Sequence, residues 1–385
     1  MNSMEFFKSE LLKIEESGLF RKIREIEKSE GKYIYIGGEK YIDFSSNNYL
    51  GLRDDERVKE AAIKAVEKYG AGSGASRAVT GTALIYRELE EKIALFKNKE
   101  KALVFNSGYD ANVAIFSSIF DAKDVVFTDR LVHASIIDGI KLSGAKMIRF
   151  KHNDIEELEE KLKKYGSMYK KSGVVTESVF SMDGDIGKVA EIAKLKERYG
   201  FIYIVDEAHA TGVFGKRGSG IVEEKGVEKS VDIVMGTLGK ALGSFGAYAA
   251  SSREINSYLI NRARPFIFST SLPPSAVGAA MKAVEIVESS NQVREKLQEN
   301  FRYMQSKIEE AGFKNISSTQ IIPVIIGENS KTMELQKKME ESGIIAAGIR
   351  PPTVPEGSAR LRITINALHT KEDMDFLISR IREQV

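Results

Sequence analysis

The sequence predicts an α/β fold in which a mainly parallel seven-stranded sheet is flanked by helices and followed by a smaller α+β C-terminal domain. Two observations support this prediction. Short apolar runs alternate with amphipathic helical patterns through the middle of the chain, and a separate group of strands and helices follows a long helical stretch. Strands that alternate with helices ordinarily lie parallel, because each helix returns the chain to the same end of the sheet.

The strands of the predicted sheet are short runs rich in valine, isoleucine and phenylalanine. They are Ala102–Phe105, Val125–Thr128, Lys146–Phe150, Gly173–Glu177, Phe201–Val205, Asp232–Met235 and Gly246–Ala250. Helical patterns separate most of them, for example at Ile155–Lys164 and Ala190–Tyr199. Ligands of such sheets bind beyond the carboxyl ends of the strands, so the residues that follow each strand are the candidates for a functional site.

The C-terminal part begins with one long helical pattern from Pro274 to about Gly312. A smaller unit is predicted after it, with strands at Ile321–Ile326, Ile344–Ile349 and Ala359–Ile365 and helices at Thr332–Ser342 and Lys371–Gln384. We therefore expect an N-terminal segment at residues 1–50, a large domain at 51–273 and a C-terminal domain at 274–385.

The composition excludes several classes of protein. The 385 residues include 57 basic and 55 acidic side chains, and this balance argues against a nucleic-acid or membrane-surface partner. There is no cysteine, which excludes disulfides and Cys-based metal sites, and the four histidines are widely spaced, so no metal is expected. The charged N-terminus lacks the apolar stretch of a signal peptide, so we expect a cytoplasmic protein.

The segment FIYIVDEAHATG places Asp206 at the end of a predicted strand and His209 three residues later. A DEAH-box helicase is one interpretation, but it requires a phosphate loop of the form GxxxxGK[ST], and no Gly-Lys pair of the chain fits that pattern. The second interpretation is a cofactor site in which a buried carboxylate pairs with a protonated pyridine nitrogen. The third interpretation is an aspartate that only caps the end of a strand and binds no cofactor.

The segment VDIVMGTLGKALG places Lys240 after another strand, among Gly236, Gly239 and Gly243. Small residues let a planar ligand approach the backbone, and a shielded lysine becomes a nucleophile. Thr237 has a hydroxyl suited to a phosphate. By itself the motif also fits a surface lysine in a glycine-rich turn; together with the Asp206 segment it favours a lysine that carries a cofactor.

Three further strand ends carry polar residues. Ser107, Gly108 and Tyr109 precede or begin a helix, where free N–H groups make a natural phosphate site, although an ordinary Ser-capped helix fits equally. His133 follows the next strand, where its ring could stack on a flat cofactor or simply cap a helix. Ser181 follows a third strand, as a hydroxyl for a ring substituent or as a turn residue.

These segments in this order, SGYDAN, HAS, FSMDGD, VDEAHATG and GTLGKALG, resemble the α-oxoamine synthase family of fold-type I enzymes that use pyridoxal 5′-phosphate (PLP). The resemblance runs from about Arg21 to the C-terminal helix. Members condense an amino acid with an acyl thioester and lose CO2, so the resemblance implies a PLP-dependent acyltransferase. A helicase or a scaffold without activity remains the alternative of a different class.

The resemblance implies a role for each strand-end residue. Lys240 would carry PLP as a Schiff base and act on the Cα proton, with Asp206 at the pyridine nitrogen, His209 at the ring hydroxyl and His133 stacked on the ring. The remaining contacts with the cofactor are assigned to Ser107, Gly108, Tyr109, Ser181, Thr237 and Thr270. Thr270 is the residue expected to reach the phosphate of a partner subunit, which implies a homodimer with shared active sites.

For the substrates, the resemblance assigns the amino-acid carboxylate to Asn47 and Arg362, whose planar guanidinium grips both oxygens. The segment IRPPTVP is most similar to members that join L-alanine to a pimeloyl thioester on CoA or a carrier protein, in biotin biosynthesis. By that match Thr353 contacts substrate and Arg21 meets the pimeloyl carboxylate, unless Arg21 is a solvated helix arginine. One departure from the family pattern is Tyr86, where many members have histidine. The alternative to the pimeloyl-dependent reaction is glycine C-acetyltransferase activity, or both activities in one enzyme.

Overall fold

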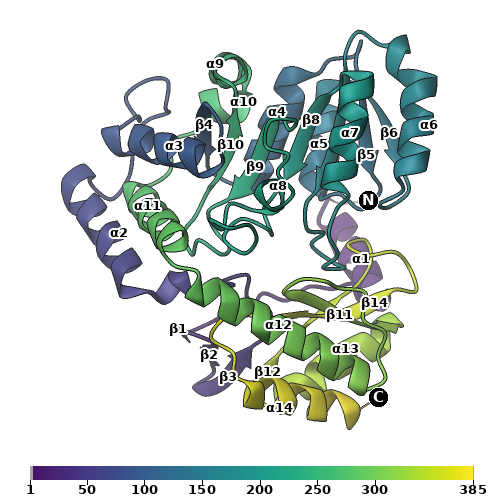
Figure 1. Ribbon diagram of the computed structural model, residues 1–385. Helices are drawn as coiled ribbons and strands as arrows, with labels where there is room; N and C mark the ends of the chain where they lie inside the picture. The colour runs from purple at the N-terminus through teal and green to yellow at the C-terminus, as the bar shows by residue number, and fades with distance from the viewer. Residues whose placement is uncertain (1–2, 385) are drawn as a thin grey trace. The chain divides into compact units, whose positions relative to one another are not determined.

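The computed structural model describes residues 3–384, which form two compact units (Figure 1). The larger unit comprises Asn47–Ser181 and Asp185–Lys296, and the smaller unit comprises the residues up to Ser46, Met182–Gly184 and the chain from Leu297 onward. Helix α11 (Pro274–Ser289) belongs to the larger unit, whereas the sequence pattern grouped it with the C-terminal domain. The exact domain boundaries after residues 50 and 273 remain predictions.

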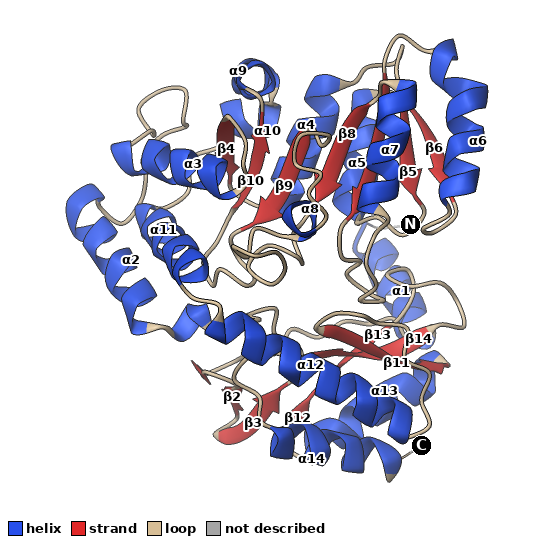
Figure 2. Cartoon of the chain, viewed as in Figure 1, coloured by secondary structure: helices blue, strands red, loops and turns tan. Residues whose placement is uncertain are grey.

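The larger unit is built around a seven-stranded sheet of order β4-β10-β9-β8-β7-β5-β6 (Figure 2). Its strands are β4 (Lys101–Phe105), β5 (Val125–Asp129), β6 (Lys146–Phe150), β7 (Ser172–Glu177), β8 (Ile202–Asp206), β9 (Ile233–Thr237) and β10 (Ala247–Ser251). Strand β10 runs antiparallel to both of its neighbours, and the neighbouring pairs from β9 to β6 are parallel. The predicted fold class and all seven predicted strands are confirmed.

Helices cover both faces of this sheet. They are α2 (Glu56–Tyr69), α3 (Leu84–Phe96), α4 (Gly108–Ile119), α5 (Ala134–Ser143), α6 (Ile155–Tyr165), α7 (Val189–Tyr199), α8 (Ile221–Glu224), α9 (Arg253–Arg262), α10 (Arg264–Ile267) and α11, with short 3-10 turns at Leu52–Asp54 and Gly166–Met168. Apolar residues of α4, α5, α9 and α10 form one core with the sheet, in which Ile204 of β8 takes part. The adjacent Tyr203 faces the other way, since strand side chains alternate, and donates a hydrogen bond to the Val189 carbonyl of α7.

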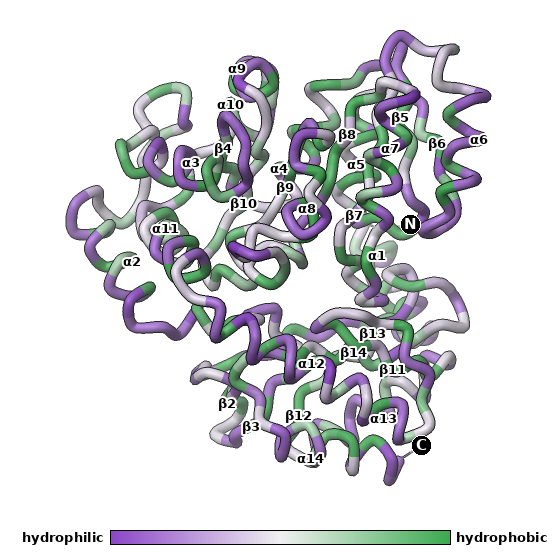
Figure 3. Tube along the Cα trace, viewed as in Figure 1, coloured by the Kyte–Doolittle hydropathy of each residue, from purple (hydrophilic) through white to green (hydrophobic). Residues whose placement is uncertain are grey.

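Local chemistry determines where several of these helices begin. Ser107, Asp154 and Ser252 are N-cap residues whose side chains accept a hydrogen bond from a backbone N–H in the first turn of α4, α6 and α9. Helix α6 alternates between hydrophilic and hydrophobic stretches in Figure 3, and it buries Leu158 and Leu162. Two of these caps therefore fix loops that follow strands at the carboxyl edge of the sheet.

The smaller unit contains two sheets. The first has the order β1-β2-β3-β12, with β1 (Lys28–Glu30), β2 (Tyr33–Ile36), β3 (Glu39–Asp43) and β12 (Ile344–Ile345), and the second has the order β11-β14-β13, with β11 (Ile321–Gly327), β13 (Ala347–Ile349) and β14 (Ala359–Thr364). Its helices are α1 (Ser3–Glu16), α13 (Asn329–Glu341) and α14 (Lys371–Arg382), and α12 (Gln292–Glu310) continues into it from the larger unit. No helix among residues 3–384 is long and apolar enough to cross a membrane.

Two elements differ from their predictions. The long helical pattern after Pro274 is two helices, α11 and α12, because the chain is extended at Ser290 (φ −143°, ψ 131°). The Arg294 guanidinium donates to the Ser290 carbonyl at 3.0 Å. The predicted strand Ile344–Ile349 is two strands, since β12 pairs parallel with β3 while β13 pairs antiparallel with β14. The first break lies in the polar run from Glu288 to Gln292, whereas the second lies within an apolar run.

Candidate functional site

Lys240 and His209 lie in direct contact at the carboxyl edge of the sheet in the larger unit. Lys240 follows β9, and its Nζ lies 2.8 Å from Nε2 of His209, which follows β8. His209 is 6% exposed, and its Nδ1 lies 2.6 Å from the hydroxyl of the fully buried Tyr49. The two residues are thus joined in the structure as neighbours of one site.

Asp206 is the last residue of β8 and is held on both carboxylate oxygens. One oxygen accepts from the Asn112 side chain at 2.9 Å, and the other accepts from the backbone N–H of Ala208 at 2.9 Å. The same Asn112 nitrogen also lies 3.0 Å from the hydroxyl of Ser135. The carboxylate is therefore fixed in orientation, and only 5% of the residue is exposed.

His133 is the N-cap residue of α5, and its Nδ1 lies 2.8 Å from the hydroxyl of Ser135. Asn112 and Ser135 therefore connect the Asp206 carboxylate to the His133 ring. Desolvation by the surrounding protein lowers the pKa of His133, the Asp206 charge opposes this, and the Lys240 charge adds to it. The residue still has a large exposed surface, so a neutral ring is available to a planar ligand.

A second buried carboxyl group, Glu177, stands beside Asp206. Glu177 ends β7 in register with Asp206, is 3% exposed, and accepts the backbone N–H of His133 at 2.5 Å. Burial raises the pKa of Glu177 well above its ordinary value, and the Asp206 charge raises it further. Two adjacent buried acids are thereby kept from carrying two negative charges.

The turn at Ser107, Gly108 and Tyr109 lies against Thr237. A Cβ atom added to Gly108 would lie 2.8 Å from Cγ2 of Thr237, so the two segments approach closely only because residue 108 is glycine. The first-turn N–H groups of α4 have no partner within the helix and carry its positive dipole end. Thr270 lies near this turn, since its carbonyl accepts from the side chain of Asn106, and it is exposed.

A buried ion pair fixes the segment that carries Asp206 and His209. Nζ of Lys97 lies 2.8 Å from Glu207 and 3.0 Å from the hydroxyl of Thr211, and the side chains of the Lys97–Glu207 pair are 1% and 0% exposed. Burial by itself lowers the pKa of Lys97, but the Glu207 charge and hydrogen bond raise it above its ordinary value. Removing one partner would leave an unpaired buried charge, so this pair anchors the turn after β8.

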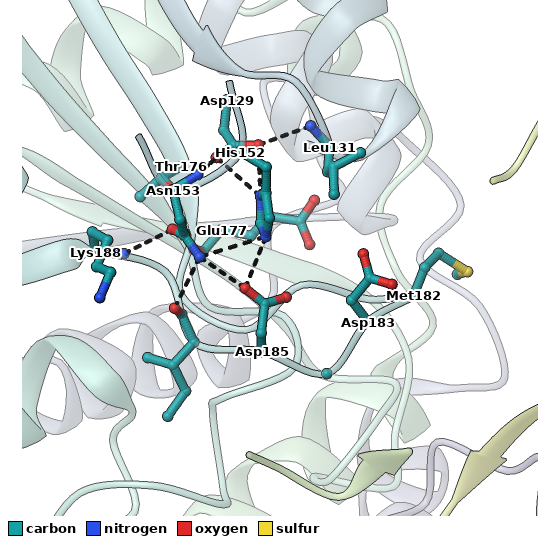
Figure 4. Close-up of polar contacts among 12 residues, drawn as sticks. Asp129, Leu131, His152, Asn153, Thr176, Glu177, Met182, Asp183, Asp185 and Lys188 are labelled. Atoms are coloured by element: carbon teal, nitrogen blue, oxygen red, sulfur yellow. Dashed lines mark hydrogen bonds and ion pairs between the residues drawn. The ribbon is translucent and has the colours of Figure 1, made fainter. Parts of the chain in front are cut away.

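A further polar cluster occupies the carboxyl ends of β5 and β6. Figure 4 shows His152 between Asp129 and Asp185, with ring nitrogens 3.0 Å and 2.8 Å from their carboxylate oxygens. Burial alone lowers the pKa of His152, yet the hydrogen bonds to both carboxylates raise it to about 10. The doubly protonated ring therefore ties the end of β5 to the segment that follows Ser181, which is 9% exposed.

The predicted substrate residues divide between the units. Asn47 lies in the larger unit, where its Oδ1 accepts from the Tyr49 hydroxyl at 3.1 Å. In the smaller unit Arg362 is only 7% exposed on β14, where its Nη1 lies 2.9 Å from the hydroxyl of Thr364. It is thus not a surface arginine.

Arg21 and Thr353 lie on exposed segments of the smaller unit. Arg350 donates a hydrogen bond to the Gly18 carbonyl, and its pKa is lowered by burial and then by the charge of Arg21, so the two arginines are neighbours. Arg350 also lines an open cleft of about 1200 Å³ together with Leu19 and Phe20. The Arg21 guanidinium has no carboxylate partner within residues 3–384.

Sequence reasoning assigned no role to Tyr49, Asn112, Ser135 and Glu177, although each contacts an assigned residue. Glu177 is the last residue of one predicted strand, and Asp206 directly follows another. Inspecting the residues at strand ends could therefore have found Glu177 as well. Tyr86, the departure from the family pattern, is a buried residue of α3 whose hydroxyl donates to the Leu272 carbonyl. Among residues 3–384 no group of three or more His, Asp or Glu side chains is arranged to hold a metal ion.

Comparison with known proteins matches residues 39–381 to the family described as aminotransferase class I and II. The chain is 49% identical to 8-amino-7-oxononanoate synthase of Geotalea daltonii over 98% of this chain and 97% of the relative. It is 44% identical to the enzyme of the same name from Thermoanaerobacter pseudethanolicus, over 97% and 95% of the two chains.

Two solved structures are similar over most of the chain. Serine palmitoyltransferase from S. paucimobilis, solved with a PLP–myriocin aldimine, superposes with a TM-score of 0.93 at 30% identity, over 98% of this chain and 96% of that one. 8-Amino-7-oxononanoate synthase from Francisella tularensis superposes with a TM-score of 0.78 at 33% identity, over 89% and 97%.

Proposed function

The chain belongs to the aminotransferase class I and II family, and we propose that it is a PLP-dependent acyltransferase that joins L-alanine to a pimeloyl thioester. The observation that supports this most directly is the contact of Lys240 with His209 beside the buried Asp206 carboxylate, in a chain 49% identical to an 8-amino-7-oxononanoate synthase. The products are 8-amino-7-oxononanoate, CO2 and a free thiol on CoA or a carrier protein, and the pathway is biotin biosynthesis.

The residues of the larger unit fit PLP. Asp206 would offer a fixed carboxylate to the pyridine nitrogen, His209 would bind the ring hydroxyl, and the exposed His133 would offer a stacking face. The turn of Ser107, Gly108 and Tyr109 presents helix N-terminal N–H groups to the phosphate, next to Thr237. Ser181, which follows β7, is proposed to contact the ring.

When bound, PLP supplies an electrophilic carbon that captures the substrate amine and a cationic ring that takes up the electron pair left when Cα loses its proton. Lys240 would hold the cofactor and, once the amine of alanine has replaced it, would be placed to remove the proton from Cα. The Asp206 carboxylate would pair with the ring nitrogen and favour its protonated form. Because burial favours the neutral form of Glu177, this neighbouring carboxyl group adds no second negative charge beside Asp206.

The remaining steps are carried by the substrates themselves. Cα of alanine, after giving its proton to Lys240, would form a bond to the thioester carbonyl carbon while the C–S bond breaks. The released thiolate would take a proton from solvent, the α-carboxylate would leave as CO2, and Lys240 would return its proton to Cα. Asn47 and Arg362 are proposed to bind the alanine carboxylate until it leaves, the arginine with its two-pronged guanidinium. Thr353 is proposed to contact substrate, and Arg21, supported by Arg350, to bind the terminal pimeloyl carboxylate.

The proposal includes a cytoplasmic homodimer with shared active sites. Thr270 is exposed, and the nearby Phe268 and Phe245 expose 69% and 56% of their surfaces, which is unusual for phenylalanine and suits coverage by a second copy. Light scattering is expected to give twice the chain mass. A monomer with full activity would contradict the shared site.

A substrate matrix tests the reaction. Alanine, glycine and serine are combined with pimeloyl-, acetyl- and succinyl-CoA, and thiol release and CO2 are followed. We expect turnover to be fastest with alanine and pimeloyl-CoA. Turnover only with glycine and acetyl-CoA would replace the proposal by glycine C-acetyltransferase activity, which the names of the relatives do not favour.

The cofactor has a separate test that does not depend on the substrates. Purified protein is expected to absorb in the visible range when PLP is added, and borohydride reduction should leave the cofactor on the peptide that contains Lys240. A protein that PLP cannot reconstitute would contradict the whole proposal.

A further inference from the structure

Tyr49 links two residues of the candidate site and has no role in the function proposed above. Its side chain is fully buried, its hydroxyl lies 2.6 Å from Nδ1 of His209, and it donates to Oδ1 of Asn47 at 3.1 Å. On the other side of the same imidazole, Nε2 lies 2.8 Å from Nζ of Lys240. Four side chains thus form one chain of hydrogen bonds, in the order Asn47, Tyr49, His209, Lys240.

The direction of each hydrogen bond in this chain follows from its two ends. An ammonium group has only donors, so Lys240 donates and Nε2 of His209 must accept. At the other end the Tyr49 hydrogen is given to Asn47, so the tyrosine oxygen is left to accept from His209. Both ends therefore require the proton of the neutral ring to be on Nδ1.

We propose that Tyr49 is a positioning residue that holds His209 in the Nδ1–H form, so that Nε2 takes a proton from the Lys240 ammonium and leaves a neutral amine. The N–H bond of the ammonium breaks, an N–H bond forms at Nε2, and the imidazolium keeps its Nδ1–H bond to the Tyr49 oxygen. A neutral amine is the form of lysine that attacks a carbonyl carbon. The consequence for PLP capture rests on the proposed function, whereas the protonation of His209 does not.

The first test is the tautomer of His209 in the full chain freed of cofactor. The chain has only four histidines, so nitrogen-15 NMR with a His209→Gln spectrum assigns the signal. Because the Lys240 ammonium by itself also favours the Nδ1–H form, the variants are compared in a chain that carries Lys240→Met. In that background we expect the Nδ1–H form with Tyr49 present and the Nε2–H form, which imidazole prefers in water, in Tyr49→Phe. Asn47→Asp keeps the acceptor oxygen and should keep the Nδ1–H form, whereas Asn47→Ala should lose it.

The second test is the rate at which the cofactor-free chain captures PLP, followed by absorbance between pH 6 and 9. Tyr49→Phe is expected to slow capture about tenfold near neutral pH and to restore it at high pH, where the lysine loses its proton without help. The matched control is Tyr86→Phe, which also removes one buried tyrosine hydroxyl but lies outside the chain of hydrogen bonds. It should leave both the tautomer and the pH profile unchanged, even if it lowers the melting temperature.

The outcomes separate the two proposals. An Nδ1–H ring in Tyr49→Phe combined with Lys240→Met, or an unchanged pH profile of capture in Tyr49→Phe alone, overturns the role of Tyr49. Failure of the wild type to capture PLP at any pH overturns the proposed function, while the NMR measurement still decides the tautomer.

Discussion

The predicted functional residues are held very differently in the two units. At the carboxyl edge of the larger sheet, Asp206 and His209 are nearly buried and fixed by hydrogen bonds, and Lys240 contacts His209 directly. In the smaller unit Arg21 and Thr353 lie on exposed segments, and only Arg362 is buried on a strand. The difference suggests that the reaction depends on a preorganised network, whereas the choice of acyl chain depends on segments that change at little cost to the fold.

The strongest test of this contrast is Lys240→Ala. Because Lys240 is the lysine that contacts His209, we expect kcat to fall by at least about 10³-fold, with a melting temperature close to that of the wild type. Lys240→Arg keeps the positive charge but not the nucleophile and should be equally inactive. Thiol release measures the rate; activity above one hundredth of the wild type in either variant would rule out this role.

Arg362→Ala tests the predicted substrate residue that is buried in the smaller unit. Loss of charged hydrogen bonds to a carboxylate is expected to raise KM for alanine by about 10- to 100-fold, with KM for the thioester nearly unchanged. Arg362→Lys keeps the charge but loses the planar fork, so it should recover only part of the effect. Equal changes in both KM values would point to a general loss of structure.

Two histidines, one in each unit, predict opposite responses of stability to pH. The pKa of His152 is raised to about 10, above the value near 6.5 in an unfolded chain, so its stabilisation is complete below about pH 6.5 and is lost as the pH rises toward 10. His152→Gln should therefore lower the melting temperature at pH 6 and have a much smaller effect at pH 9.5. An effect that is equal at both pH values would contradict the charged ring.

His369 in the smaller unit behaves in the opposite sense. It is stacked on Phe44, with ring centroids 4.1 Å apart, and burial lowers its pKa to about 4. The unfolded chain takes up this proton below about pH 6.5, so stability is lost as the pH falls from 6.5 to 4. His369→Phe, which cannot titrate, should lose less stability over that range than the wild type, as measured by thermal melts at matched ionic strength.

The same contrast explains what the sequence could predict. The seven strands of the larger sheet were predictable because each is an apolar run ended by turn residues, and their ends differ from the prediction by about one or two residues. The break between α11 and α12 was missed although the polar run Ser289–Asn291 interrupts the apolar pattern there, and such a run is a turn signal. Tyr49 was missed because spacing along a chain does not show which strand end a side chain will meet, whereas Glu177 ends a predicted strand and could have been found there.

Arg21→Ala is expected to have the smallest effect, and it tests whether the exposed segment selects the acyl chain. An exposed ion pair contributes about 0.2–1 kcal/mol, so KM for pimeloyl-CoA should rise by about 1.4- to fivefold while KM for alanine stays the same. Arg24→Ala is the matched control, because Arg24 lies on the same segment but already pairs with Glu340 at 2.6 Å. If Arg21→Ala also raises KM for an acyl-CoA of similar length without a terminal carboxylate, then the guanidinium contributes general affinity, and the selection of a dicarboxylic chain lies elsewhere in the smaller unit.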